Sequence, residues 1–221
     1  AANQLSSRGT AVSLQLGQTA PDFTAESSLD KIHFHDWAKG KWTVFFSHPK
    51  DFTPICTTEL GQFAKRKAEF DKRGAQLIGL SVDPPHSHRE WIKDVAKVGG
   101  AEVHYPIVAD PDLKIAKQYG MFHPEADATV TVRSVFLIDP KHKVRLILTY
   151  PPSIGRNINE ILRALDALQQ SDKQGVATPV DWKPGEDVVV PPSVSDADAE
   201  KRYPGKIRRA TSYLRFVPAE S

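Results

Sequence analysis

The sequence has a single cysteine and no long apolar run. Cys56 stands alone among 221 residues, so the chain cannot form an internal disulfide or a cysteine-based zinc site. This excludes the disulfide-rich class of secreted proteins and favours a reducing compartment. The longest apolar runs, such as Val135–Ile138, have four residues, and a segment of that length cannot cross a membrane.

An excess of charge of one sign is also lacking. The 29 Lys and Arg residues nearly balance the 27 Asp and Glu residues, which leaves a formal net charge of +2. Without a basic tract, the sequence gives no indication of a nucleic-acid partner. Hydrophobic residues make up 40% and charged residues 25% of the chain, which is typical of a soluble globular protein.

Acidic residues are absent from residues 1–21, which include Ser6, Ser7, Arg8 and Ser13. This composition is that of the remnant of an organelle transit peptide. A disordered tail is the alternative interpretation, and the composition alone does not separate the two.

Apolar strands alternate with amphipathic helices from residue 41 to residue 170. Short apolar runs bounded by turn residues predict strands at 41–49, 75–83, 104–110, 129–139 and 143–151. Apolar residues at helical spacing predict helices at 56–74, 87–100, 111–120 and 155–170. This order, which ends in a hairpin and a helix, predicts a mixed α/β sheet covered by helices.

The composition changes after Gln170. The following segment is rich in Pro and Val and has no helical period. We therefore place a domain boundary near residue 171, between a compact domain at 14–170 and an extended C-terminal arm at 171–221 that carries short strands. An arm of this kind needs a surface to lie on, either its own domain or a partner subunit.

Cys56 lies where a thiol can ionise. Thr53 suits the N-cap of a helix and Pro54 its first residue, so Cys56 falls in the first turn. The helix dipole there favours a thiolate, which is the nucleophilic form. Lowering a thiol pKa by about two units takes about 2.7 kcal/mol, whereas a helix terminus supplies about 0.3–1 kcal/mol. A nearby cation is therefore needed; the alternative is that Cys56 is a small buried hydrophobic residue.

The stretch from Pro49 to Cys56, PKDFTPIC, matches the peroxiredoxin pattern Pro-x-x-x-Thr-x-x-Cys. With His48 before the proline, it resembles the one-cysteine branch of that family. Further segments similar to this branch follow in order, among them LIGLSVD, TVRSVFLIDP and VATPVDWKPGEDVVVPPSV. The resemblance covers roughly residues 14–217 and is greatest to fungal mitochondrial members.

This resemblance implies a thioredoxin-like α/β fold, a mixed central sheet flanked by helices, with a C-terminal arm. It also implies a thiol-dependent peroxidase, in which the Cys56 thiolate attacks a hydroperoxide and becomes a sulfenic acid. By match of motif, Thr53 holds the peroxide oxygens and Pro49 shields the thiolate from water. Arg133, in TVRSVF, supplies the cation beside the thiolate.

Three further residues match positions around the site in this family. His48 corresponds to a pocket histidine, Glu59 to an acidic residue that orients pocket groups, and Arg156 to a second arginine. From the residues alone, Arg133 could instead be an edge charge and His48 a structural histidine. Glu59 and Arg156 could serve the fold or a dimer contact.

With no second cysteine, the sulfenic acid must be reduced by an external thiol. The resemblance implies no prosthetic cofactor, and glutathione, glutaredoxin or a thioredoxin system as candidate reductants. It also implies a homodimer without nucleic-acid or membrane partners. A mitochondrial matrix location fits the acid-poor N-terminus, with the cytoplasm as the alternative.

Two other function classes remain open from the sequence. One is a Cys-His hydrolase or transferase that uses Cys56 and His48. The other is a redox-sensing chaperone in which oxidation changes assembly. Animal relatives with phospholipase activity use a histidine that matches His35, but Lys41 stands at their serine position, so we expect no such activity. No histidine spacing resembles a metal site.

Overall fold

The computed structural model describes residues 13–221. The proposed transit-peptide remnant therefore lies mostly outside the described residues. The chain divides into two compact units, one ending at Arg156 and the other spanning Asn157–Ser221. This division lies before the last long helix, whereas the sequence predicted a boundary near residue 171. The two positions differ because the helix groups with the C-terminal unit, and the helical period of a sequence does not show to which unit a helix belongs.

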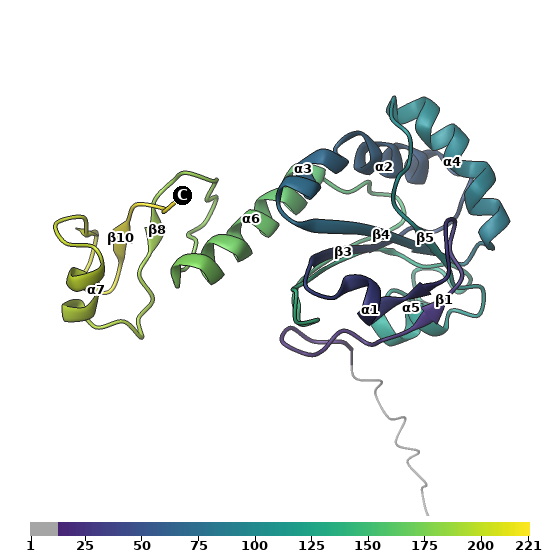
Figure 1. Cartoon of the computed structure of the whole chain (residues 1–221). Coiled ribbons are helices and arrows are strands. Elements are labelled where there is room, and N and C mark those ends of the chain that lie inside the picture. The colour runs from purple at the N-terminus through teal and green to yellow at the C-terminus, as the bar shows by residue number, and fades with distance from the viewer. Residues whose placement is uncertain (1–12) are drawn as a thin grey trace, which may run out of the picture. The chain divides into compact units, whose positions relative to one another are not determined.

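The first unit is built on a five-stranded sheet with the order β5-β4-β3-β6-β7 (Figure 1). Its strands are β3 (Trp42–Ser47), β4 (Ala75–Ser81), β5 (Ile107–Ala109), β6 (Arg133–Ile138) and β7 (Val144–Tyr150). The first three are parallel, and β6 and β7 run antiparallel to their neighbours. The predicted mixed sheet is confirmed.

Helices cover both faces of this sheet (Figure 1). The helices α2 (Pro54–Lys65), α3 (Lys67–Lys72) and α4 (Pro85–Gly99) lie over one face. The other face carries α1 (Phe34–Ala38) and α5 (Lys114–Tyr119). All six residues of β3 are buried, as expected for a central strand covered on both sides.

The core follows the alternation of side chains along β3. Phe45 meets Tyr119 of α5 edge to face, with ring centroids 4.9 Å apart. The next residue, Phe46, points to the opposite face and stacks on Phe63 of α2 at 4.0 Å. The helix that carries Cys56 is therefore packed directly on the central strand.

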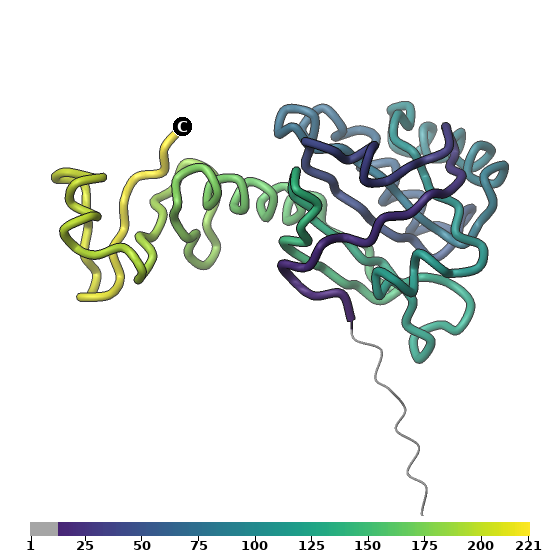
Figure 2. Tube along the Cα trace, turned by 60° about the horizontal axis from the view of Figure 1, so that its bottom comes forward, coloured from purple at the N-terminus to yellow at the C-terminus, as the bar shows by residue number. Residues whose placement is uncertain are grey.

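The N-terminal part of the first unit is fastened to the sheet by main-chain bonds. The short strands β1 (Thr24–Ala25) and β2 (Ile32–His33) pair with each other. Before them, Gly17 donates to Val144 O (2.8 Å), and Ala20 donates to His142 O (2.7 Å). This segment runs beside the turn between β6 and β7 (Figure 2).

Two elements differ from the sequence prediction. The helix expected at 56–74 is interrupted at Arg66, which lies outside the helical region at φ −102° and ψ 13°. The strand expected at 104–110 is limited to β5. Pro106 cannot donate to a ladder, and its carbonyl accepts from Gly79 N instead.

The second unit contains α6 (Ile158–Gln174), α7 (Asp196–Arg202) and a three-stranded sheet with the order β8-β10-β9. Its strands are short, as predicted: β8 (Val188–Val189), β9 (Arg208–Arg209) and β10 (Arg215–Val217). The buried Trp182 belongs to a hydrophobic cluster within this unit.

Helix α7 was not predicted from the sequence. Its N-cap is Ser195, whose hydroxyl accepts from Asp198 N at 3.1 Å. Ser195 followed three residues later by an acidic residue is a local signal for a helix start. None of the described helices is long and apolar enough to cross a membrane.

The contact between α2 and α4 leaves no room for a side chain at Gly99. A Cβ atom there would lie 2.5 Å from the carbonyl oxygen of Gly61. Replacing glycine by alanine inside a helix normally stabilises the protein by about 0.5–1 kcal/mol, but overpacking costs about 1–3 kcal/mol.

We expect Gly99→Ala to lower the free energy of unfolding, measured by urea denaturation. Val98→Ala, at a 60% exposed neighbour, is the control, and a stabilised Gly99→Ala would contradict the packing argument.

Candidate active site

Cys56 lies in the first turn of α2 and is fully buried. Pro54 begins the helix, and Thr53 has the extended backbone of an N-cap, with φ −125° and ψ 151°. The expected side-chain cap is absent, because the Thr53 hydroxyl donates to Lys50 O at 2.6 Å. The Thr53 oxygen therefore stays in the loop before the helix, and the first-turn amides have no side-chain cap.

Arg133 lies against the thiol. Its Nη1 is 3.2 Å from Cys56 Sγ, and its Nε and Nη2 donate to Pro152 O at 2.9 and 2.7 Å. Arg133 is the first residue of β6, which runs antiparallel to β3. The start of β6 therefore meets the end of β3, from which the chain continues to α2. The Arg133 guanidinium is therefore the cation that ionisation of the Cys56 thiol was expected to need.

Glu59 joins two arginines beneath the thiol. Its carboxylate accepts from Arg133 Nη1 at 2.5 Å and from Arg156 Nε and Nη2 at 2.7 and 2.9 Å. Arg156 Nη1 also donates to Ser47 O and Ser134 O. Burial raises the pKa of Glu59, but the adjacent Arg156 and then Arg133 outweigh burial and hold it below its usual value.

The charges of this group balance only when Cys56 is ionised. Two guanidinium groups and one carboxylate leave one positive charge in a buried site, since Arg133 is 3% and Arg156 9% exposed. An unpaired buried charge is costly. A thiolate at Cys56 cancels it, which explains how a fully buried thiol can be a nucleophile.

His48 and Pro49 are also buried, at the end of β3. His48 Nε2 pairs with Asp51 Oδ1 at 2.7 Å, and its Nδ1 has no hydrogen-bond partner. Burial lowers the pKa of His48 and outweighs the opposing effect of Asp51. Among the described residues, His48 makes no hydrogen bond to Cys56.

Comparison with known proteins agrees with this geometry. The model of the AhpC/TSA family matches residues 16–147, and that of the C-terminal domain of 1-Cys peroxiredoxin matches residues 167–206. A 1-Cys peroxiredoxin of Dictyostelium discoideum is 49% identical over 93% of this chain and 85% of its own. The chain belongs to the one-cysteine peroxiredoxin family.

Other relatives agree with this assignment. The mitochondrial peroxiredoxin PRX1 of Saccharomyces cerevisiae is 46% identical over 94% of this chain and 82% of its own. The crystal structure of peroxiredoxin 6 from Arenicola marina has a TM-score of 0.89 at 41% identity, covering 94% of this chain and 99% of that one. A yeast mitochondrial 1-Cys peroxiredoxin has a TM-score of 0.87 at 47% identity, covering 93% and 99%.

Family membership confirms the predicted thioredoxin-like fold and the predicted activity. The peroxiredoxin is a thiol-dependent peroxidase that uses cysteine redox chemistry without a prosthetic cofactor. Its single cysteine makes it depend on an external thiol for reduction.

A cavity of about 640 Å³ lies beside the site of this peroxiredoxin. Its lining comes from the loop before α2, from α2 and from α4: Phe52, Thr53, Pro54, Thr57, Thr58, Asp94, Lys97 and Val98. Phe52 is 57% exposed and has φ 57°, a left-handed conformation that a bulky residue adopts only under constraint.

A second buried polar group, centred on Asp51, was not predicted from the sequence. Asp51 bonds to His48 at 2.7 Å and to His88 Nδ1 at 2.6 Å, and these three residues could in principle hold a metal ion. Ligands that share an ion with bonds of about 2.0–2.1 Å lie roughly 3 Å or more apart. The two contacts are shorter, so hydrogen bonds account for them. Residues 48, 51 and 88 form no local sequence pattern that would have revealed the group.

The histidines outside the site have other partners. His33 lies in β2 near Thr24 Oγ1 (3.2 Å), and His35 lies in α1, so the two do not share one strand. His35 Nε2 bonds to Ala20 O at 2.7 Å, and its ring stacks on His142. Lys41 is exposed. The expected lack of phospholipase activity stays a prediction.

We expect Glu59→Gln to destabilise the fold in a pH-dependent way. A carboxyl whose pKa is lowered on folding stabilises the protein above its unfolded value, here 4.5, and this contribution is lost as pH falls through the folded value. Breaking a buried ion pair costs about 3–5 kcal/mol, so the loss measured by urea unfolding should be greatest above pH 5 and shrink below pH 4.5.

Glu160→Gln is the matched control. The Glu160 and Arg163 side chains of that ion pair are 36% and 34% exposed, and an exposed pair contributes little to the free energy of unfolding. A Glu59→Gln loss that stays constant from pH 7 down to pH 3 would contradict the assignment.

Proposed function

We propose that Arg133 activates Cys56 for attack on hydroperoxides. The observation that supports this is the 3.2 Å contact between Arg133 Nη1 and Cys56 Sγ, within a group balanced only by a thiolate. The sulfur attacks the terminal peroxide oxygen as the O–O bond breaks. Cys56 becomes a sulfenic acid, and the leaving oxygen takes a proton and departs as water or an alcohol.

Arg133 suits both stages of this step. Negative charge moves from sulfur to the leaving oxygen during attack, and a fixed planar cation can interact with both positions. Two bonds to Pro152 O hold the guanidinium. It also donates to Glu59, which is bonded in turn to Arg156. We assign Glu59 and Arg156 to positioning for this reason.

Thr53 is proposed to bind the peroxide. Its hydroxyl hydrogen is directed to Lys50 O, so its oxygen is left to accept the peroxide O–H. Thr53 also lines the cavity beside the site. Pro49, buried at the end of β3, is proposed to limit the access of water, and His48 to line the site as a neutral ring.

The reductant of oxidised Cys56 is proposed by analogy with a similar protein. In the yeast mitochondrial 1-Cys peroxiredoxin of known structure, the thiol is resolved via glutathione and thioredoxin systems. We propose glutathione, with glutaredoxin, or a thioredoxin system as the reductant of Cys56 sulfenic acid. Adding these candidates in turn to the oxidised chain distinguishes them.

Two proposals concern the setting of the enzyme. We propose a homodimer that involves the arm at 171–221. Sedimentation of the chain with and without the arm would test this, and the same number of subunits in both would refute it. We propose the mitochondrial matrix on the basis of the acid-poor N-terminus and the similar yeast mitochondrial protein. Recovery of the native protein only in the cytosolic fraction would contradict that location.

The alternative functions gain no support. A Cys-His hydrolase needs the histidine within hydrogen-bond reach of the nucleophile, whereas His48 Nε2 bonds to Asp51. No observation on the described residues favours the redox-sensing chaperone.

We expect Cys56→Ser to abolish peroxide reduction without unfolding, because serine is nearly isosteric and the chain has no other thiol. Mass spectrometry of the native chain after one equivalent of peroxide should show one added oxygen on Cys56. Glutathione, glutathione with glutaredoxin, and thioredoxin are then added in turn, and the true reductant restores the original mass. Residual peroxidase activity in folded Cys56→Ser would refute the assignment.

We expect Arg133→Ala to slow the reaction of Cys56 with peroxide by about 10²–10³-fold, the usual cost of losing one group that stabilises developing charge. Stopped-flow kinetics measures the rate, and the absorbance of the thiolate reports how much of the thiol is ionised at each pH. Arg133→Lys, which keeps the charge but loses the forked geometry, should give an intermediate rate. An unchanged pH–rate profile in Arg133→Ala would contradict the assigned role.

A further inference from the structure

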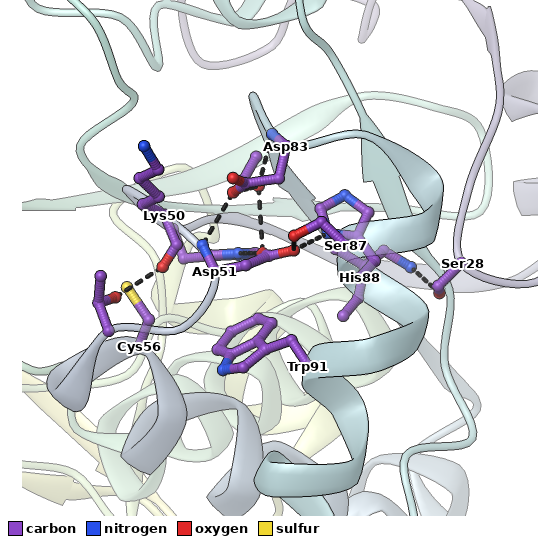
Figure 3. Close-up of polar contacts among 12 residues, drawn as sticks. Ser28, Lys50, Asp51, Cys56, Asp83, Ser87, His88 and Trp91 are labelled. Carbon is purple, nitrogen blue, oxygen red and sulfur yellow. Dashed lines mark hydrogen bonds and ion pairs between the residues drawn. The ribbon is translucent and has the colours of Figure 1, made fainter.

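Asp51 is the centre of a second buried polar cluster, distinct from the group around Glu59. We call it the Asp51 cluster, and its members are His48, Asp51, Ser81, Asp83, Ser87 and His88. Figure 3 shows Asp83, Ser87 and His88 converging on Asp51 from one side, with Cys56 beyond the loop on the other. The cluster therefore connects the loop before α2 with the end of β4 and the start of α4.

Asp51 is held by both its side chain and its main chain. Its carboxylate accepts from His88 Nδ1 at 2.6 Å and from Ser87 Oγ at 2.9 Å. Its backbone N–H donates to Asp83 Oδ2 at 2.8 Å. Burial opposes ionisation, but the hydrogen bonds from His48 and His88 outweigh it and hold the pKa of Asp51 well below its usual range. Asp51 is thus an acceptor with a fixed position.

Among residues 13–221, His88 has two hydrogen-bond partners, both of them oxygen atoms. Its Nδ1 faces the Asp51 carboxylate, and its Nε2 lies 3.1 Å from Val108 O of β5. A carboxylate can only accept, so His88 Nδ1 donates to Asp51. The ring is fully buried and therefore fixes Asp51 relative to β5 and α4 through a charge-assisted bond.

The position of Asp51 determines the state of His48. Because Asp51 only accepts, His48 Nε2 must donate to it (2.7 Å). The hydrogen is then on Nε2 and the lone pair on the buried Nδ1, which has no hydrogen-bond partner in the described part of the chain. Asp51 thus sets the tautomer of His48, and His88 holds the same carboxylate through its other oxygen.

Few other bonds hold the loop at 48–53. At its two ends, His48 N donates to Leu80 O, Thr131 Oγ1 donates to His48 O, and Thr57 donates to Thr53 O. Between the ends, the Thr53 hydroxyl reaches only as far as Lys50 within the loop itself. Phe52 has a positive φ of 57°, and such strain persists only where surrounding contacts over-determine the conformation. The Asp51 cluster supplies those contacts immediately before Phe52.

Among the described residues, Arg133 makes no hydrogen bond to the loop at 48–53. Its guanidinium is bonded to Pro152 O and to Glu59 of α2, whereas Thr53 follows Asp51 along the chain. A shift of Asp51 would displace Thr53 and the first turn of α2 from Arg133. Misplacement of reacting groups by about 1 Å can cost about 10²-fold in rate.

We propose that His88 is a positioning residue for the peroxide step. Through Asp51 it holds the loop at 48–53, so that Thr53 and Cys56 face Arg133. This inference rests on the proposed function of Cys56 and Arg133. The competing explanation is that His88 only ties α4 to β5 through Val108.

Two variants of His88 separate these explanations, because each keeps one of its two hydrogen bonds. In His88→Asn the amide nitrogen takes the place of Nδ1 and can still donate to Asp51. In His88→Gln it takes the place of Nε2 and can donate only to Val108 O. Both substitutes are neutral amides, so comparable losses of stability are expected in urea unfolding.

The rate of Cys56 oxidation is measured by stopped-flow tryptophan fluorescence across pH, since Trp91 lies 4.8 Å from the His48 ring. We expect His88→Asn to stay within about threefold of the native rate and His88→Gln to fall by about tenfold or more. Reduction of the preformed sulfenic acid by thiol, measured separately, should be alike in both variants.

Equal rates in the two variants, or a faster His88→Gln, would overturn the inference while leaving the proposed function intact. A native chain whose Cys56 is not oxidised by peroxide would overturn the proposed function and the inference with it. Should both His88 variants fail to fold, Ser87→Ala removes one donor to the same Asp51 oxygen and leaves His88 in place. A two- to fivefold slower oxidation, on the order expected for one lost hydrogen bond, supports the inference, and an unchanged rate overturns it.

Discussion

Two buried guanidinium groups constrain the whole active site. Arg133 and Arg156 lie below the surface around a single carboxylate, Glu59. A buried charge must be paired or it destabilises the fold, and one positive charge remains after Glu59 is counted. The Cys56 thiolate is the group in contact that can balance it. In the proposed mechanism, stability and reactivity therefore depend on the same balance of charge.

The sheet topology and the α2–α4 contact make this arrangement rigid. Antiparallel pairing of β6 with β3 delivers Arg133 to the end of β3. On the other side, Gly61 and Gly99 bring the backbones of α2 and α4 into direct contact. The Trp91 indole donates to Thr57, and the Tyr105 hydroxyl donates to the Leu60 carbonyl. The helix that carries Cys56 is thus fixed along its length as well as at its start.

Much of the fold and the centre of the site could be predicted from the sequence. Strand and helix periodicity indicated the mixed sheet, and the energy needed to ionise Cys56 called for a cation, which the resemblance identified as Arg133. Thr53 is the N-cap residue as predicted, but its side chain makes no cap bond, because the local pattern cannot show that the hydroxyl prefers Lys50 O. The Asp51 cluster was missed for a different reason. Its partners at 83, 87 and 88 come together only when α4 packs beside the loop, and each of them alone resembles an ordinary polar residue.

The two buried polar groups have different proposed roles. Arg133, Glu59 and Arg156 determine the charge around the Cys56 thiol, whereas the Asp51 cluster positions the loop at 48–53. The left-handed conformation of Phe52 costs about 1–3 kcal/mol. A hydrogen bond to a charged group contributes about 1.5–3 kcal/mol, and Asp51 accepts such bonds from His48, Ser87 and His88. These bonds oppose the strain and favour the conformation that presents Thr53 and Cys56 together.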